Sequence, residues 1–128
     1  MSPEGLLLLF AALSSFVGGV VNSILGERYV LTRLSRCTDL PKLFGNANYT
    51  IRVLRASWHS TTIAWWGAAA LFFCMAQAPL NTTIASKILA VTFLLVFLVT
   101  FFISRGRHIA WPVFAIISAI AFWGAHTL

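Results

Sequence analysis

The sequence predicts an all-α fold, a polytopic membrane protein in which four transmembrane helices form an antiparallel bundle. Of its 128 residues, 59% are hydrophobic and only 9% are charged. Four apolar runs lie at about 6–25, 56–76, 84–103 and 109–128. Each has close to the ~20 residues with which a helix crosses a ~30 Å hydrocarbon core. Since little chain remains for a soluble domain, we expect a single transmembrane domain over residues 1–128.

The positions of the basic residues predict the orientation in the membrane. Eight of the nine Lys and Arg residues lie between the first and second runs or between the third and fourth. The gap 77–83 carries no charge. Because basic residues are retained on the cytoplasmic side, the segment 26–51 should be a cytoplasmic loop, and both termini should lie outside. We therefore expect a multi-pass protein of the bacterial inner (plasma) membrane.

The first run is expected to be a membrane helix that starts near the beginning of the chain. Ser2 is a good N-cap, Pro3 suits the first turn, and Glu4 is favourable near the positive end of the helix dipole. A cleaved signal peptide would require a basic residue before the run, and none is present. Further along, Asn81 is interpreted as a helix cap rather than as a glycosylation site.

The four helices differ in the size of their side chains. Small residues recur in the first, second and fourth runs, whereas 84–103 is bulky on all sides. Since small residues let helices approach closely in lipid, the first, second and fourth helices should form the packed centre. The third helix should then face lipid or a partner.

The segment 26–51 has two interpretations. Its apolar residues, Leu31 and Phe44 among them, could form an amphipathic piece that lies on the membrane surface while the arginines point to water. The alternative is an ordinary disordered connection.

The densest group of polar residues marks the start of the second helix. Arg52, Arg55, His59, Thr62 and Trp66 fall on one helical stripe. This stripe should descend from the cytoplasmic surface into the membrane. Ionisable residues in a membrane segment are a functional hypothesis by default, because burying them there is costly.

Further polar residues should reach the same level from neighbouring helices. They are Asn22, Ser23, Glu27 and Arg28 at the end of the first helix, and Arg107 and His108 at the start of the fourth. With the stripe, they predict a cytoplasm-facing, net-positive pocket for an anionic headgroup or small ligand. The alternative is structural: the arginines only set the topology, and Glu27 pairs with one of them.

The sequence predicts no metal, cofactor or catalytic residue. His59 and His108 lie at similar expected depth, which would permit haem ligation, but two histidines alone make a weak metal set. Serines and threonines surround His59, yet Glu27 and Asp39 are assigned to the loop. No acidic residue within the membrane should therefore orient the histidine for hydrolytic catalysis. Topology and anionic lipid explain the positive charge, so nucleic acid is not an expected partner.

Two patterns resemble groups of membrane proteins. The Arg-x-x-Arg-Ala motif that opens the second helix of the membrane-associated eicosanoid and glutathione metabolism family is similar to Arg52-Val53-Leu54-Arg55-Ala56. This resemblance implies a glutathione-dependent membrane enzyme, but His59 and Thr62 stand where the family has Asn and Glu. Small four-helix bacterial membrane proteins are also similar, through Leu25-Gly26-Glu27-Arg28, Leu54-Arg55-Ala56-Ser57-Trp58-His59 and Ala64-Trp65-Trp66-Gly67. That second resemblance implies no activity.

The sequence thus favours a small integral membrane subunit or transport-related protein without enzymatic activity, whose basic pocket is centred on Arg55 and His59. The competing interpretation is the glutathione-dependent enzyme, in which Arg52, Arg55 and His59 would hold the anionic thiol cofactor. A bundle this small cannot cover all of its apolar surface with its own helices. Besides membrane lipid, we therefore expect a homo-oligomer or a larger membrane-protein partner.

Overall fold

The chain folds into helices alone. The computed structural model describes residues 2–127, and within this range every regular element is helical. The four long helices are α1 (Pro3–Leu25), α3 (Ala47–Gln77), α4 (Thr82–Ser104) and α5 (Trp111–Thr127). The predicted all-α class with four helices is therefore confirmed.

Three of these helices begin at capping side chains. The Ser2 hydroxyl accepts the Gly5 N–H at 3.1 Å, and the Asn81 side chain accepts the Ile84 N–H at 2.8 Å, as predicted for both caps. Asn46 caps α3 in the same way. Because this cap lies well before residue 56, the second long helix begins earlier than predicted and includes the last part of the expected loop.

The first helix also extends further than predicted. After α1, the chain continues through a π-helical segment, η1 (Gly26–Leu31), into the short helix α2 (Thr32–Leu34). The Thr32 N–H bonds to the carbonyl of Glu27, five residues earlier, as in a π-helix. The predicted loop 26–51 is thereby reduced to the connection 35–46, which contains the short 3₁₀ helix η2 (Leu43–Gly45).

The amphipathic interpretation of this region is wrong for its first part. Leu31 is only 1% exposed, because η1 packs against α3. Phe44 is 91% exposed and takes a left-handed backbone conformation. The connection is also tied to α3: the Thr50 hydroxyl donates to the Pro41 carbonyl and accepts the Leu43 N–H. An ordered connection thus joins α2 to the start of α3.

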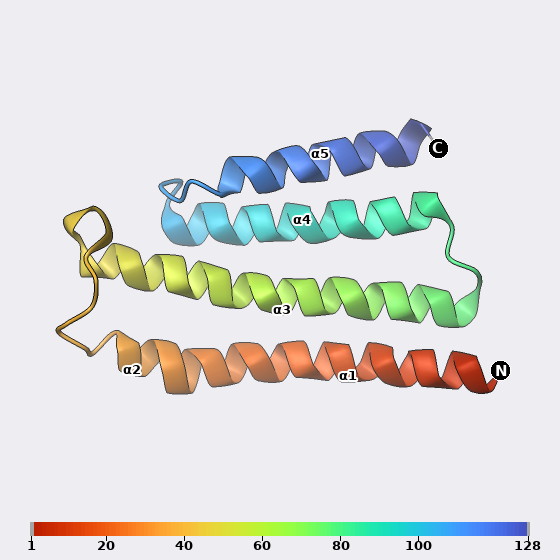
Figure 1. The fold of residues 1–128 in the computed structure, drawn as a ribbon, viewed down its shortest axis with the longest axis horizontal. Helices are drawn as coiled ribbons and strands as arrows, with labels where there is room; N and C mark the ends of the chain where they lie inside the picture. Colours follow the sequence, from red (N-terminus) through yellow and green to blue (C-terminus); the bar gives the residue numbers. More distant parts are fainter. Residues whose placement is uncertain (1, 128) are drawn as a thin grey trace.

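The four helices lie side by side in a single row. Figure 1 shows the order α1, α3, α4, α5, with the chain passing back and forth along the long axis. Helix contacts join α1 to α3, α3 to α4, and α4 to α5. The beginning of α1 and the end of α5 lie at the same end of the molecule.

The predicted packed centre of the first, second and fourth helices is wrong, because α4 lies between α3 and α5. Among its bulky residues, α4 also places small or polar side chains in close contact with both neighbours. Ala90 is fully buried, and its carbonyl accepts the Ser118 hydroxyl of α5 at 2.8 Å. Thr92 fits against Gly67 of α3, where an added Cβ would lie 2.5 Å from the threonine oxygen. A few well-placed residues therefore outweigh the helix's average bulk.

The end of the molecule opposite the beginning of α1 carries most of the positive charge. This end, which we call the basic end, comprises η1, α2, the connection 35–46, the start of α3 and the turn between α4 and α5 (Figure 1). Eight of the nine Lys and Arg residues belong to these segments. Lys87, near the start of α4, is the exception.

Two helical segments, Pro3–Leu34 and Thr82–Ser104, are long and apolar enough to cross a membrane. The apolar helix α5 is shorter, and in α3 polar residues interrupt the apolar character. Large apolar side chains cover much of the outer surface: Leu7 and Phe10 of α1 are each 71% exposed, and Trp123 of α5 is 76% exposed. Exposed apolar surface of this extent is unusual for a monomeric soluble protein.

Glycines and tryptophans shape the contact between α1–η1 and α3. Each of three glycines on the first segment faces an indole ring: Gly18 faces Trp65, Gly19 faces Trp66 and Gly26 faces Trp58. A Cβ at Gly26 would overlap the Trp58 ring. The missing side chain lets the indole N–H of Trp58 donate to the Asn22 carbonyl at 2.8 Å. These contacts set the register of the two segments that carry the polar site.

Candidate functional site

An ion pair joins η1 to α3 near the basic end. Two parallel contacts link the Arg55 guanidinium to the Glu27 carboxylate: Nη2 lies 2.8 Å from Oε1 and Nε lies 3.1 Å from Oε2. The two side chains are 34% and 40% exposed. This forked geometry holds the carboxylate in one orientation, which a single contact would not do.

His59 uses both ring nitrogens in this site. Its Nε2 lies 3.3 Å from Oε2 of Glu27, and its Nδ1 lies 2.9 Å from Oγ of Ser23. A carboxylate paired with arginine accepts hydrogen bonds and donates none. Nε2 therefore carries a proton, and in the neutral ring Nδ1 is the acceptor for Ser23.

The hydrogen bonds continue from Ser23 along α1 and α3. Oγ of Ser23 lies 2.7 Å from Oγ1 of Thr62. The Asn22 amide donates to the hydroxyls of Thr62 and Thr61, at 3.1 and 3.0 Å. We call the connected side chains the polar network: Asn22, Ser23, Glu27, Arg55, His59, Thr61 and Thr62. Within residues 2–127, no buried side-chain nitrogen or oxygen lacks a hydrogen-bond partner.

Helical spacing explains why these residues meet. Arg55, His59 and Thr62 recur at intervals of four and three residues, so they share one face of α3. Ser23 and Glu27 are likewise one turn apart on the opposite segment. Because α1 continues into η1 without a break, Glu27 stays on a helical surface facing α3. The sequence-based assignment of Glu27 to a loop, and with it the absence of an acidic group beside His59, is therefore wrong.

The structure brings together five of the nine sequence-predicted site residues: Asn22, Glu27, Arg55, His59 and Thr62. Arg28 and Arg52 lie beside the polar network in sequence, but among the described residues neither side chain has a hydrogen-bonded partner. Ser23, which the sequence ranked only among the accompanying polar groups, is central to the network.

Arg107 and His108 lie apart from the polar network, in the turn between α4 and α5. The Arg107 carbonyl accepts the Tyr49 hydroxyl at 2.9 Å, and His108 Nδ1 accepts the Ala110 N–H at 3.1 Å. The helix row accounts for this separation, since α5 contacts α4 rather than α1. His59 and His108 therefore do not face each other across a bundle, as haem ligation between them would require. Residues 2–127 contain no cluster of three or more metal-binding side chains.

A groove of about 300 Å³ opens beside the polar network. We call it the histidine groove; it is lined by Ser23 of α1, by His59, Thr62, Ile63 and Trp66 of α3, and by Leu95, Leu98 and Val99 of α4. The surface open to the groove is almost entirely apolar, because Ser23, His59 and Thr62 direct their polar atoms into hydrogen bonds with one another. Such a groove suits the apolar portion of a ligand whose polar group lies at the groove's edge.

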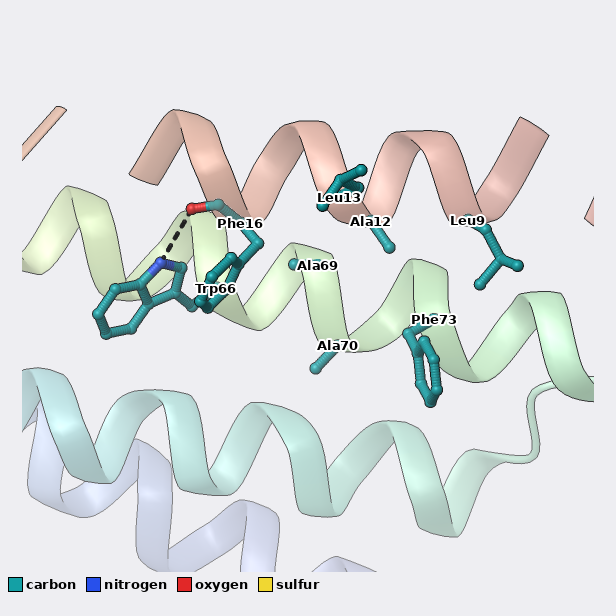
Figure 2. Close-up of a pocket in the computed structure, with 8 residues that line it drawn as sticks. All are labelled: Leu9, Ala12, Leu13, Phe16, Trp66, Ala69, Ala70 and Phe73. Carbon is teal, nitrogen blue, oxygen red and sulfur yellow. Dashed lines mark hydrogen bonds between the residues drawn. The ribbon is translucent and has the colours of Figure 1, made fainter. Parts of the chain in front are cut away.

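A second groove, of about 540 Å³, continues from Trp66 away from the basic end. This apolar groove lies between α1 and α3 (Figure 2). Ala12, Ala69 and Ala70 contribute small side chains, and larger ones come from Leu9, Leu13, Phe16, Trp66 and Phe73. The Trp66 indole N–H donates to the Phe16 carbonyl at 3.3 Å, which fixes the ring that lines both grooves.

Comparison with known proteins adds no family to this description. No protein-family model matches the chain, and neither a curated protein nor a solved structure matches it. The two sequence resemblances therefore stay predictions, and function has to be argued from the site.

Proposed function

We propose that the protein is a multi-pass protein of the bacterial inner membrane, with its basic end in the cytoplasm. Two apolar helical segments long enough to span a bilayer and the exposed apolar surfaces of α1 and α5 support this placement. The gathering of eight basic residues at one end supports the orientation. The exposed helix faces are suited to lipid, further copies of the chain or a larger membrane protein.

Within the membrane, we infer that the protein binds an anionic lipid in the histidine groove. The observation that carries this proposal is the position of the polar network at the groove's edge. Following the lining helices towards the basic end leads to Arg52 on α3 and to Arg105 after α4. An acyl chain would lie against the aliphatic side chains of α4, with its headgroup near these cations.

Charge balance favours an anionic headgroup over a neutral one. The basic end holds eight cationic residues but only two acidic ones, Glu27 and Asp39. Glu27 is already paired with Arg55, so the remaining cations exceed the available carboxylates. Each basic residue close to a membrane surface contributes about 1 kcal/mol to the attraction of anionic lipid.

Lipid retention on the intact protein tests this proposal. Native mass spectrometry should show more bound phosphatidylglycerol than phosphatidylcholine when both are supplied equally. Leu98→Trp, which fills the groove from the α4 side without replacing a residue of the polar network, should abolish that preference. Arg52→Gln should weaken retention of phosphatidylglycerol about fivefold, the equivalent of about 1 kcal/mol.

Arg33→Gln provides the matched control, because Arg33 is an exposed cation on α2, which contributes no residue to the groove, whereas Arg52 is on the lining helix α3. Retention should then change less than twofold. Equal retention of the two lipids, or an unchanged preference in Leu98→Trp, would exclude the histidine groove as the lipid site.

A further inference from the structure

We propose that Ser23 is a nucleophile that attacks acyl esters, with His59 as its general base and Glu27 as the group that orients the base. Ser23 Oγ lies 2.9 Å from His59 Nδ1, and His59 Nε2 lies 3.3 Å from Glu27 Oε2. A nucleophile, a base and an acidic orienter joined in this sequence are the arrangement of serine hydrolases, which is recognised by geometry rather than by sequence order.

The hydrogen-bond directions suit proton transfer from Ser23. With Nε2–H donating to Glu27, the neutral ring leaves Nδ1 to accept the Ser23 hydroxyl proton. Ser23 has only one proton, so Thr62 must donate in the 2.7 Å contact between the two hydroxyls. The Asn22 amide in turn donates to Thr62. Each hydrogen bond in this series is therefore donated in the direction of Glu27, and the Ser23 proton is directed at the His59 ring.

Arg55 acts as a positioning residue. Its forked contact fixes both carboxylate oxygens of Glu27, and Oε2 is the oxygen that faces His59. The carboxylate thereby holds the imidazole in the tautomer with Nδ1 unprotonated. The partial exposure of Glu27 and Arg55 places this end of the network near solvent, from which a hydrolytic water would come.

The histidine groove indicates the class of substrate. Ser23, His59 and Thr62 contribute to one wall, Leu95, Leu98 and Val99 form the facing wall, and the surface open to the groove is almost entirely apolar. An ester carbonyl beside Ser23 would leave an aliphatic acyl chain in contact with α4. The substrate class is therefore an oxygen ester or thioester of an acyl chain, presented from within the membrane.

The reaction divides into two balanced steps. Ser23 Oγ forms a bond to the acyl carbon while its proton passes to His59 Nδ1. The bond to the leaving alcohol or thiol then breaks, and that group takes the proton from the ring. Water attacks the resulting acyl-serine, gives one proton to Nδ1, and the carboxylic acid leaves as Ser23 recovers its proton. No oxidant, metal or cofactor enters either step.

Thr62 is the donor that we assign to the oxyanion: once Ser23 Oγ bonds to the acyl carbon, the Thr62 hydroxyl turns from that oxygen to the neighbouring carbonyl oxygen. A single side-chain donor stabilises an oxyanion less than a preorganised set of several. Turnover should accordingly be slow. Covalent trapping of Ser23 is therefore a more direct measurement than steady-state hydrolysis.

An alkyl fluorophosphonate applied to the purified full-length protein tests the proposal. Ser23 Oγ should displace fluoride and form a bond to phosphorus, which mass spectrometry would detect on the peptide containing Ser23. Ser23→Ala should abolish labelling, whereas Ser15→Ala, two turns earlier on α1, should leave it unchanged. His59→Gln should slow labelling at least 100-fold, the lower limit for loss of a general base.

Two further readouts separate catalysis from folding. Glu27→Gln should slow labelling while Glu27→Asp restores part of it, and added imidazole should accelerate labelling of His59→Ala. Unmodified Ser23 in the wild-type protein, or a rate that His59→Gln leaves unchanged, would overturn the proposal. The proposal uses the histidine groove but not its anionic ligand. Lipid retention without labelling would reject only this activity, and labelling without lipid preference would reject only the lipid site.

Discussion

The two outer helix pairs of the row are held together by different chemistry. Between α1–η1 and α3, a forked ion pair, a chain of hydroxyl, amide and imidazole contacts, and three glycine–tryptophan contacts fix the interface. Between α4 and α5, aromatic rings dominate. Trp111 contacts Phe101 and Phe97, with ring centroids 5.2 and 5.9 Å apart, and Ser118 makes the one side-chain hydrogen bond between these two helices among the described residues.

This difference indicates where the fold is specified and where chemistry can occur. Hydrogen bonds and close glycine contacts depend on register, because a shift of one residue would separate their partners. Aromatic and aliphatic contacts tolerate small shifts, since many neighbouring positions offer similar surface. The α1–α3 pair therefore carries both the register and the polar network, while α4 supplies the facing apolar wall of the histidine groove.

The largest effect should come from filling the space at Gly26. Gly26→Ala would place a Cβ inside the Trp58 ring, so the ring must move and lose its hydrogen bond to the Asn22 carbonyl. Overpacking of this kind costs about 1 to 3 kcal/mol. We expect the free energy of unfolding in detergent, followed by tryptophan fluorescence, to fall by about 2 kcal/mol.

Gly124→Ala in α5 is the matched control. A Cβ at Gly124 meets no atom within 4 Å, and alanine is a better helix former than glycine by up to about 1 kcal/mol. The control should be neutral or stabilising. If the two substitutions had the same effect, the close approach of α1–η1 and α3 at Trp58 would not be a source of stability.

The sequence predicted the elements of this fold better than their arrangement. Apolar runs predicted all four helices, and Ser2 and Asn81 were correctly interpreted as caps. The stripe of Arg55, His59 and Thr62 predicted the α3 half of the site, because helical spacing is a local property that can be read from one segment.

The arrangement depends on contacts between segments, which local patterns do not specify. Average side-chain size suggested that α4 lies outside, but Ala90 and Thr92 make close contacts with the helices on either side of it. Likewise, the composition of residues 26–31 resembles a loop. Leu31 is buried against α3 in this helical segment, and Glu27 reaches both Arg55 and His59. The sequence placed these residues at one level and offered the arginine pairing as an alternative, but it did not predict the histidine contact.

A smaller effect should follow from breaking the ion pair. A double-mutant cycle of Glu27→Ala and Arg55→Ala isolates the coupling between the two side chains. Because the Arg55 and Glu27 side chains are 34% and 40% exposed, solvent screens the pair. We expect a coupling of about 1 kcal/mol, near the upper end for exposed pairs. Unfolding in detergent would provide the four free energies.

The same cycle performed with Glu27→Ala and Arg52→Ala is the control, since among the described residues Arg52 forms no ion pair or hydrogen bond with Glu27. That coupling should lie close to zero. Equal couplings for both arginines would mean that Glu27 responds to the overall positive charge and not to its contact with Arg55. The ion pair would then not contribute to the register of the α1–α3 interface.

The smallest effect should arise at Ser118, where the α4–α5 interface has its interhelical hydrogen bond. Ser118→Ala removes the donor but leaves the Ala90 carbonyl with its partner inside α4, so no polar atom is orphaned. Interhelical bonds of this type contribute about 0.6 kcal/mol in membrane proteins. Ser60→Ala, which removes only a bond to Ala56 within α3, should lower the free energy of unfolding by less.

A loss of unfolding free energy at Ser118 larger than that at Gly26 would reverse the ranking of the interfaces. The α4–α5 interface would then depend on directional contacts more than the α1–α3 interface does.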